Sequence, residues 1–205
     1  MKKRNYEVKT VNEALDLAVV DLGINKEELT AKVVNEKKGF LGIGGKLEVE
    51  ITPNIDGIEK GKKYLQMILE TNNVQGFIEK RVRGNIVEFN IDAGDFNGVL
   101  IGKNSKHLIA LQTILNLIIN SYYEEDNQQI VKLDVGGYRH RRESQLERLA
   151  VDFGKQVAKT KQEIKLDHLN SYERKIIHDK LSTWKDVQTR SEGEEPNRFL
   201  IIEPK

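Results

Sequence analysis

A glycine followed by short polar and basic residues, between two apolar stretches, is the first candidate site in the sequence. Residues 98–118 read GVLIGKNSKHLIALQTILNLI. A glycine turn that leads into a helix holds phosphate in nucleotide-binding enzymes and in modules that bind single-stranded RNA. In both cases backbone amides and the positive end of the helix face the anion. The candidate residues in this turn are Gly102, Lys103, Asn104, Ser105 and Lys106.

The residue types of this turn suit contact with a polynucleotide backbone. Gly102 lets the main chain approach closely, Lys103 can pair with a phosphate, and Asn104 can hydrogen-bond a sugar or base edge. Lys106 is either a further contact or a solvated surface lysine. Ser105 is also a good helix N-cap, so an ordinary connection between two helices is the alternative interpretation.

Enzymatic phosphate binding fits the same residues poorly. A nucleotide-binding loop needs G-x-x-x-x-G-K-[ST], whereas Gly98 and Gly102 are one residue too close and Asn104 stands at the hydroxyl position. The chain has no cysteine, and His140 and His168 lack partners at metal-ligand spacing. We therefore expect no enzyme activity, no metal and no cofactor.

Arg174 and His178 form a second candidate site. Four residues apart on one helix, they share a face, where the guanidinium can bind a phosphate and the imidazole can stack on or hydrogen-bond a base. A surface arginine near a neutral histidine is the alternative. Three arginines open a preceding long helix, where an anion would relieve their unfavourable interaction with the helix dipole. They are Arg139, Arg141 and Arg142.

Composition places the basic charge late in the chain. The 205 residues are 38% hydrophobic and 32% charged, with a net charge of +1. Residues 136–190 hold 13 basic and 8 acidic side chains, so a polyanion would bind there. Gln112, Asn116 and Asn120 interrupt the longest apolar stretch, so we expect no transmembrane segment and a cytoplasmic location.

Hydrophobic periodicity predicts an α+β protein in three segments. The first, residues 1–54, reads β-α-β-β, with a helix over 11–22 that ends at Gly23. The second, residues 57–135, reads α-β-β-α-α-β, with strands over 74–82 and 86–91 and the glycine turn between its second and third helices. The third, residues 136–205, has a long amphipathic helix, a short helix capped by Asn170 or Ser171, and short strands.

Three stretches together resemble one bacterial family. VLIGKNSKHLIALQTILNLIIN resembles the KH signature V-x-I-G-[KR]-x-G-x-x-[IL]-x-x-[IL]-Q-x-[IL]-[IL]-N of the Jag family, the SpoIIIJ-associated proteins also called KhpB or EloR. Ser105 replaces the second glycine of that signature. KKGFLGIGGK resembles the family's N-terminal domain, and ERKIIHDKL with SEGEEPNRFLII resembles its R-x-x-x-H domain.

The resemblance implies three α+β domains and a function. Residues 1–54 would form the Jag N-terminal domain, 57–135 a type II KH domain, and 136–205 an R-x-x-x-H domain that binds single-stranded nucleic acid. The family role is that of an RNA-binding post-transcriptional regulator connected to cell elongation and cell shape, with single-stranded DNA as an alternative ligand. The competing hypothesis is a protein-interaction adaptor near the membrane insertion or cell-wall machinery.

Two apolar features predict protein partners. Residues 105–123 form a helix whose apolar arc covers about half its circumference, more than one sheet covers. The resemblance favours pairing with the small KH protein KhpA, or self-association. The glycine-rich loop over residues 39–45 carries three large apolar side chains and either joins a core or docks a membrane-proximal partner.

Overall fold

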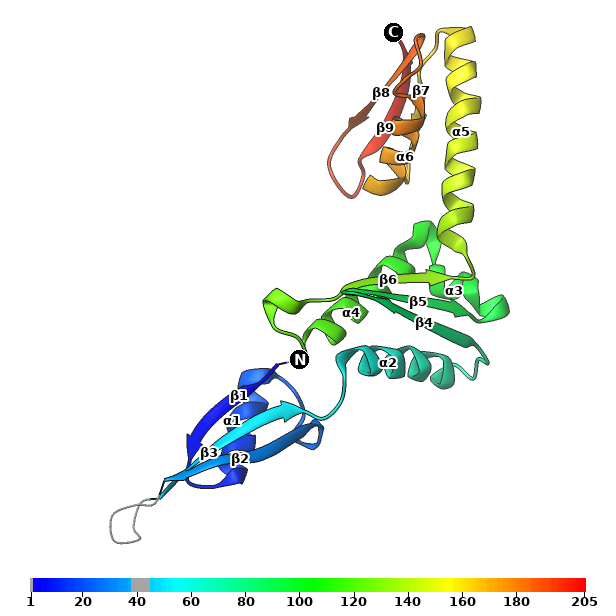
Figure 1. The fold of residues 1–205 in the computed structure, drawn as a ribbon. Coiled ribbons are helices and arrows are strands. Elements are labelled where there is room, and N and C mark those ends of the chain that lie inside the picture. The colour runs from blue at the N-terminus through cyan, green and yellow to red at the C-terminus, as the bar shows by residue number, and fades with distance from the viewer. Residues whose placement is uncertain (1, 38–44) are drawn as a thin grey trace. The chain divides into compact units, whose positions relative to one another are not determined.

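The computed structural model describes residues 2–37 and 45–205, and within these ranges the chain forms three three-stranded sheets, each with helices beside it (Figure 1). The predicted α+β class is confirmed. The chain divides into two compact units, one of Met1–Asn97 with Leu108–Asp134 and one of Gly98–His107 with Val135–Lys205. The glycine turn thus groups with the C-terminal residues. Most of the loop over residues 39–45 lies outside the described residues.

The first sheet has the predicted β-α-β-β order. Its strands pair antiparallel in the order β1-β3-β2, and a helix covers one face. The helix starts at Thr10, whose side chain accepts from the Glu13 amide, and ends at Gly23 with φ +66°. Ala14 and Ala18 are fully buried beneath it. The elements are β1 (Arg4–Val8), α1 (Val11–Leu22), β2 (Leu29–Lys37) and β3 (Lys46–Pro53).

The middle segment has the predicted α-β-β-α-α-β order and a sheet in the order β4-β5-β6. Strand β4 begins at Phe77, three residues later than predicted, because Gly76 packs tightly: a Cβ there would lie 2.9 Å from Leu69 Cδ1. The elements are α2 (Gly57–Thr71), β4 (Phe77–Arg83), β5 (Ile86–Asp92), α3 (Asn97–Ile101), α4 (Lys106–Asn120) and β6 (Ile130–Val135).

The first sheet and the middle segment share a core within the first unit. Tyr122, which follows α4, is 4% exposed and packs with the buried residues of the first sheet. Its hydroxyl donates to Glu28 Oε2 at 2.7 Å, and Lys60 of α2 donates to the other Glu28 oxygen. Tyr123 donates to Asp56, whose side chain also caps α2. The short connection before α2 is therefore held at both ends.

The C-terminal residues form a third core between two helices and a sheet in the order β7-β9-β8. Asn170 caps the shorter helix, which settles the choice between Asn170 and Ser171. Gly154 lets the helices approach, because a Cβ there would lie 2.8 Å from Leu181 Cδ2. The elements are α5 (Tyr138–Thr160), β7 (Ile164–Leu166), α6 (Ser171–Leu181), β8 (Val187–Glu192) and β9 (Phe199–Pro204).

None of the helices formed by the described residues has the length and apolar character needed to span a membrane.

Candidate nucleic-acid interface

The glycine turn between α3 and α4 has an unusual backbone. Gly102 has φ +69°, Asn104 φ +54° and Ser105 φ +61°. Positive φ suits glycine, is tolerated by asparagine, and strains a serine. Strained conformations of this kind persist only where the surrounding structure holds them, and they are common at binding sites.

Gly102 is needed by its neighbour His107 as well as by its own φ angle. A Cβ on Gly102 would lie 2.5 Å from Cγ of the His107 ring. The ring is fixed by its Nδ1, which lies 2.7 Å from the carbonyl oxygen of Val99 in α3. His107 therefore packs over Gly102 and ties the end of α3 to the start of α4.

Ser105 does not act as the predicted helix cap. Its side chain is buried, with 7% exposure, and its hydroxyl lies 2.7 Å from the hydroxyl of Tyr138, the first residue of α5. Because Ser105 adopts a left-handed conformation, its hydroxyl serves this tertiary contact. Lys103 and Lys106 on either side are exposed, and neither forms an ion pair with any described residue.

The three arginines at the start of α5 have different environments. Arg142 donates through Nε to Glu173 Oε1 at 2.6 Å, and Glu173 is only 3% exposed. The other Glu173 oxygen accepts from the Asn170 amide at 3.0 Å in the capping box of α6. Arg141 donates to the Gly136 carbonyl, and Arg139 is exposed and takes part in an interaction of its own. The anion predicted to relieve the helix dipole is, for Arg142, an internal glutamate.

Arg174 is buried, which sequence reasoning did not predict. Its Nη1 donates to the carbonyl oxygen of Leu169 at 2.8 Å and reaches that of Arg198 at 3.5 Å. Its Nη2 donates to Glu195 Oε1 at 2.6 Å. His178, one turn later, is exposed, and its Nδ1 lies 2.6 Å from Thr189 Oγ1 on β8.

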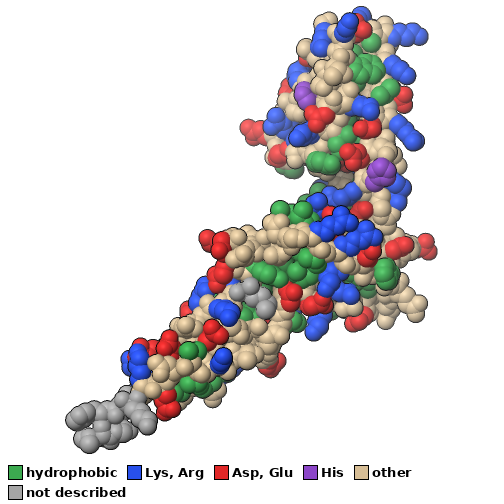
Figure 2. Space-filling view, in the orientation of Figure 1, with side chains coloured by type: hydrophobic (Ala, Val, Ile, Leu, Met, Phe, Trp, Pro, Cys, Tyr) green, Lys and Arg blue, Asp and Glu red, His purple; other side chains and the backbone are tan. Residues whose placement is uncertain are grey.

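The structure joins the predicted site residues in two groups. Ser105 meets the start of α5 through Tyr138, and Arg142 meets the start of α6 through Glu173. Between the turn and Arg174 or His178, the described residues make no direct hydrogen bond or ion pair. Figure 2 shows basic side chains spaced along α5 with acidic ones between them. Within residues 2–37 and 45–205, no cluster of His, Asp or Glu is arranged to hold a metal ion.

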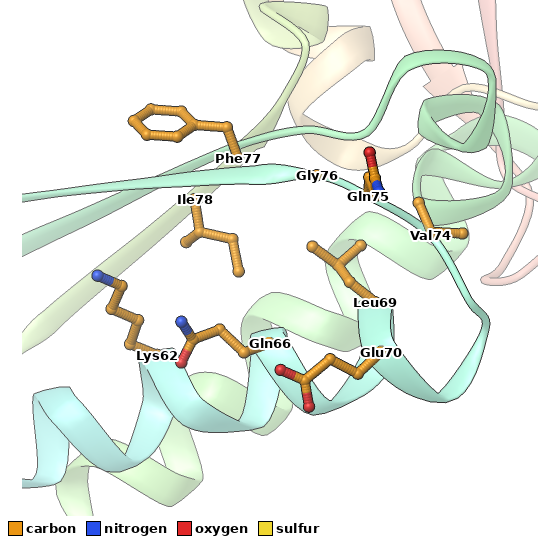
Figure 3. Close-up of a pocket in the computed structure, with 9 residues that line it drawn as sticks. All are labelled: Lys62, Gln66, Leu69, Glu70, Val74, Gln75, Gly76, Phe77 and Ile78. Atoms are coloured by element: carbon orange, nitrogen blue, oxygen red, sulfur yellow. The ribbon is translucent and has the colours of Figure 1, made fainter.

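A pocket in the first unit lies between α2 and the segment leading into β4 (Figure 3). Leu69 and Ile78 point into it, while the ring of Phe77 points to the opposite side of the strand. Lys62, Gln66 and Glu70 line it from α2. Their mixed charges do not favour a phosphate chain, so the candidate interface remains the turn and the helices that follow it.

Comparison with known proteins covers almost the whole chain. Residues 6–53 match the family described as Jag N-terminus, and residues 144–204 match the domain family named for its R-x-x-x-H motif. A protein of Bacillus subtilis (strain 168) named RNA-binding protein KhpB is 37% identical over 202 residues, covering 96% of each chain. The chain belongs to the Jag/KhpB family. A protein of the same name from Clostridium symbiosum is 36% identical over 95% of this chain and 88% of that relative.

In this Jag/KhpB member, three residues of the site escaped sequence reasoning. Glu173 had a signal, because N-x-x-E at the start of a helix is the pattern of a capping box. Tyr138 and Glu195 had none, since each acts across a tertiary contact with a residue far away in the sequence.

Proposed function

We propose that this Jag/KhpB protein binds single-stranded RNA through two tethered sites. The supporting observation is the match to the RNA-binding protein KhpB over 96% of both chains, which includes the glycine turn and all of the C-terminal residues. In this proposal residues 57–135 form a type II KH domain and residues 136–205 the second binding domain. Tethering raises the affinity of the pair above that of either site.

The surroundings of each side chain divide the proposed work. Exposed and half-buried residues would contact the ligand: Lys103 and Lys106 the phosphates beside the turn, Asn104 a sugar or base edge, Arg139 and Arg141 phosphates near α5, and His178 a base. Gly102, Ser105 and Arg142 would hold the site in shape, because their contacts are internal.

The proposed cellular role is post-transcriptional regulation linked to cell elongation and cell shape, in the cytoplasm. A KH-type partner such as KhpA, or a second copy of the chain, would cover part of α4. In support of such a partner, Leu117 is 65% exposed, Ile109 43% and Ile114 38%, all on α4. Light scattering that shows a monomer whose mass no partner changes would contradict this part of the proposal.

The test of RNA binding is fluorescence anisotropy with a labelled mixed-sequence single-stranded RNA, repeated with DNA of the same sequence, across a salt series. We expect binding that weakens steeply with salt, since basic side chains release counterions from the phosphates. Lys103→Glu/Lys106→Glu should reduce the affinity at least about tenfold at low salt, because each reversal replaces attraction with repulsion.

Lys9→Glu/Lys32→Glu is the matched control, with the same change in net charge on exposed lysines of the first sheet. Equal losses in both variants would show that only overall charge matters and would remove the turn from the site. Failure of the folded wild type to bind RNA at low salt would overturn the proposal and favour the adaptor hypothesis.

A further inference from the structure

We propose that Glu195 is an internal competitor for the RNA backbone at Arg174 and sets how strongly the C-terminal residues bind a phosphodiester. This inference rests on the proposed RNA-binding function and deepens it. It starts from a conflict between the sequence and the structure. Arg174 is the predicted phosphate ligand, yet its side chain is only 7% exposed and a carboxylate already holds it.

The contacts of Arg174 separate a fixed side from an exchangeable side. On the fixed side, Nη1 donates to the carbonyl oxygen of Leu169 at 2.8 Å, before α6, and reaches that of Arg198 at 3.5 Å, before β9. Both acceptors are backbone atoms anchored by neighbouring elements. The guanidinium plane therefore stays in place whatever its outer nitrogen binds.

On the exchangeable side, Nη2 donates to Glu195 Oε1 at 2.6 Å. The glutamate side chain is 62% exposed and lies in the loop between β8 and β9. Rotation of this one exposed side chain would uncover Nη2. Carboxylate and phosphate oxygens accept from a guanidinium in the same planar geometry, so a phosphodiester can take the place that Glu195 leaves.

The charges around the contact make this exchange selective. Glu192 at the end of β8 is paired with Arg190, whereas Glu194 forms no ion pair among the described residues. An isolated anion gains little by displacing Glu195, because it must also overcome the repulsion of this acidic segment. A nucleic-acid strand held at other basic residues supplies its phosphate at high local concentration and can displace the glutamate.

Glu195→Gln tests the inference, with Glu194→Gln as a matched control that makes the same charge change one residue away. The probe is a fluorescein-labelled mixed-sequence single-stranded RNA at moderate salt. We expect Glu195→Gln to bind about fivefold more tightly, which is the equilibrium weight of a strong exposed ion pair. Glu194→Gln should change the affinity by about twofold or less, since salt screens a charge that contacts no ligand.

The salt dependence gives an independent measurement. When RNA displaces Glu195 in the wild type, the released carboxylate takes up a cation and cancels part of the counterion release. In Glu195→Gln the slope of log affinity against log salt should steepen by up to about 0.7, the value of one phosphate of a single strand. A thermal unfolding curve for each variant, recorded before titration, confirms that the compared proteins are folded.

The outcomes separate this inference from the proposed function. Wild type that binds, with equal affinities for the two glutamine variants or a loss in Glu195→Gln, overturns the competitor while RNA binding stands. Glu195→Gln that binds when wild type does not supports a competitor strong enough to block the site. Absence of binding in all three folded proteins overturns the inference together with the function.

Discussion

The hydroxyl groups of Ser105 and Tyr138 lie 2.7 Å apart and join the glycine turn to the first residue of α5. Ser105 makes this contact from a left-handed backbone conformation that costs a non-glycine residue about 1 kcal/mol. One hydrogen bond between neutral groups contributes about 1 kcal/mol. The contact thus offsets the strain of having serine where the family signature has glycine.

Tyr138→Phe should therefore destabilise the protein by about 1 kcal/mol in the presence of Ser105, because the strain remains and the bond is lost. In the Ser105→Gly background the same change should cost close to nothing, since glycine adopts φ +61° without strain and has no hydroxyl to pair. Urea denaturation of the four proteins measures this coupling. An equal cost of Tyr138→Phe in both backgrounds would show that the two hydroxyls act independently.

Gly102→Ala should destabilise the turn by about 2 kcal/mol, since it combines an unfavourable φ of +69° with a clash against the His107 ring. Gly98→Ala is the control four residues earlier, within α3, where a Cβ meets nothing within 4 Å. That change should stabilise the helix by roughly 0.5–1 kcal/mol. Thermal unfolding distinguishes the two, and similar effects for both would mean that neither φ nor His107 constrains Gly102.

Arg142→Ala should destabilise the C-terminal residues by about 2 kcal/mol, because it leaves the buried Glu173 carboxylate without its cation. Arg148→Ala, at an exposed position on the same helix with no ion pair among the described residues, should change stability by less than about 0.5 kcal/mol. Chemical denaturation gives both values. If Arg142→Ala lowered RNA affinity without lowering stability, Arg142 would be a ligand contact and its pairing with Glu173 dispensable.

The contact between the first sheet and α2 should weaken in acid. Burial disfavours the charged form of Glu28, but hydrogen bonds from Lys60 and Tyr122 outweigh it and lower the pKa of Glu28 below its ordinary 4.5. A lowered pKa in the folded state adds stability above the ordinary value, and this is lost as pH falls through the folded value. Urea denaturation should show the difference between wild type and Glu28→Gln shrinking below about pH 4.5. A difference that stays constant into acid would exclude Glu28 as its source.

Local patterns in the sequence were sufficient for the helices and strands. Thr10 and Gly23 bound α1, and the spacing of Leu146 and Val157 predicted the buried face of α5. Strand β4 was placed three residues early, because the β-branched Val74 favoured a strand and the tight packing of Gly76 on Leu69 left no local pattern.

The candidate site was predictable by residue type and not by environment. Lys103 and His178 lie exposed, where a contact residue must be. Ser105 and Arg174 have the expected chemistry, yet they are buried and bonded to Tyr138 and Glu195, partners that lie far from them in the chain. Tertiary contacts of this kind decide whether a polar side chain faces a ligand or the protein, and a single sequence does not encode them locally.

Tyr122 has a consequence for the synthesis of the chain. The first sheet leaves the ribosome complete in its strands, but the tyrosine that packs into its core is made only after the whole of α4. Until then the apolar surface that Tyr122 covers is open to other contacts in the cell. The N-terminal sheet is thus the first part of this protein to be translated and one of the later parts to be finished.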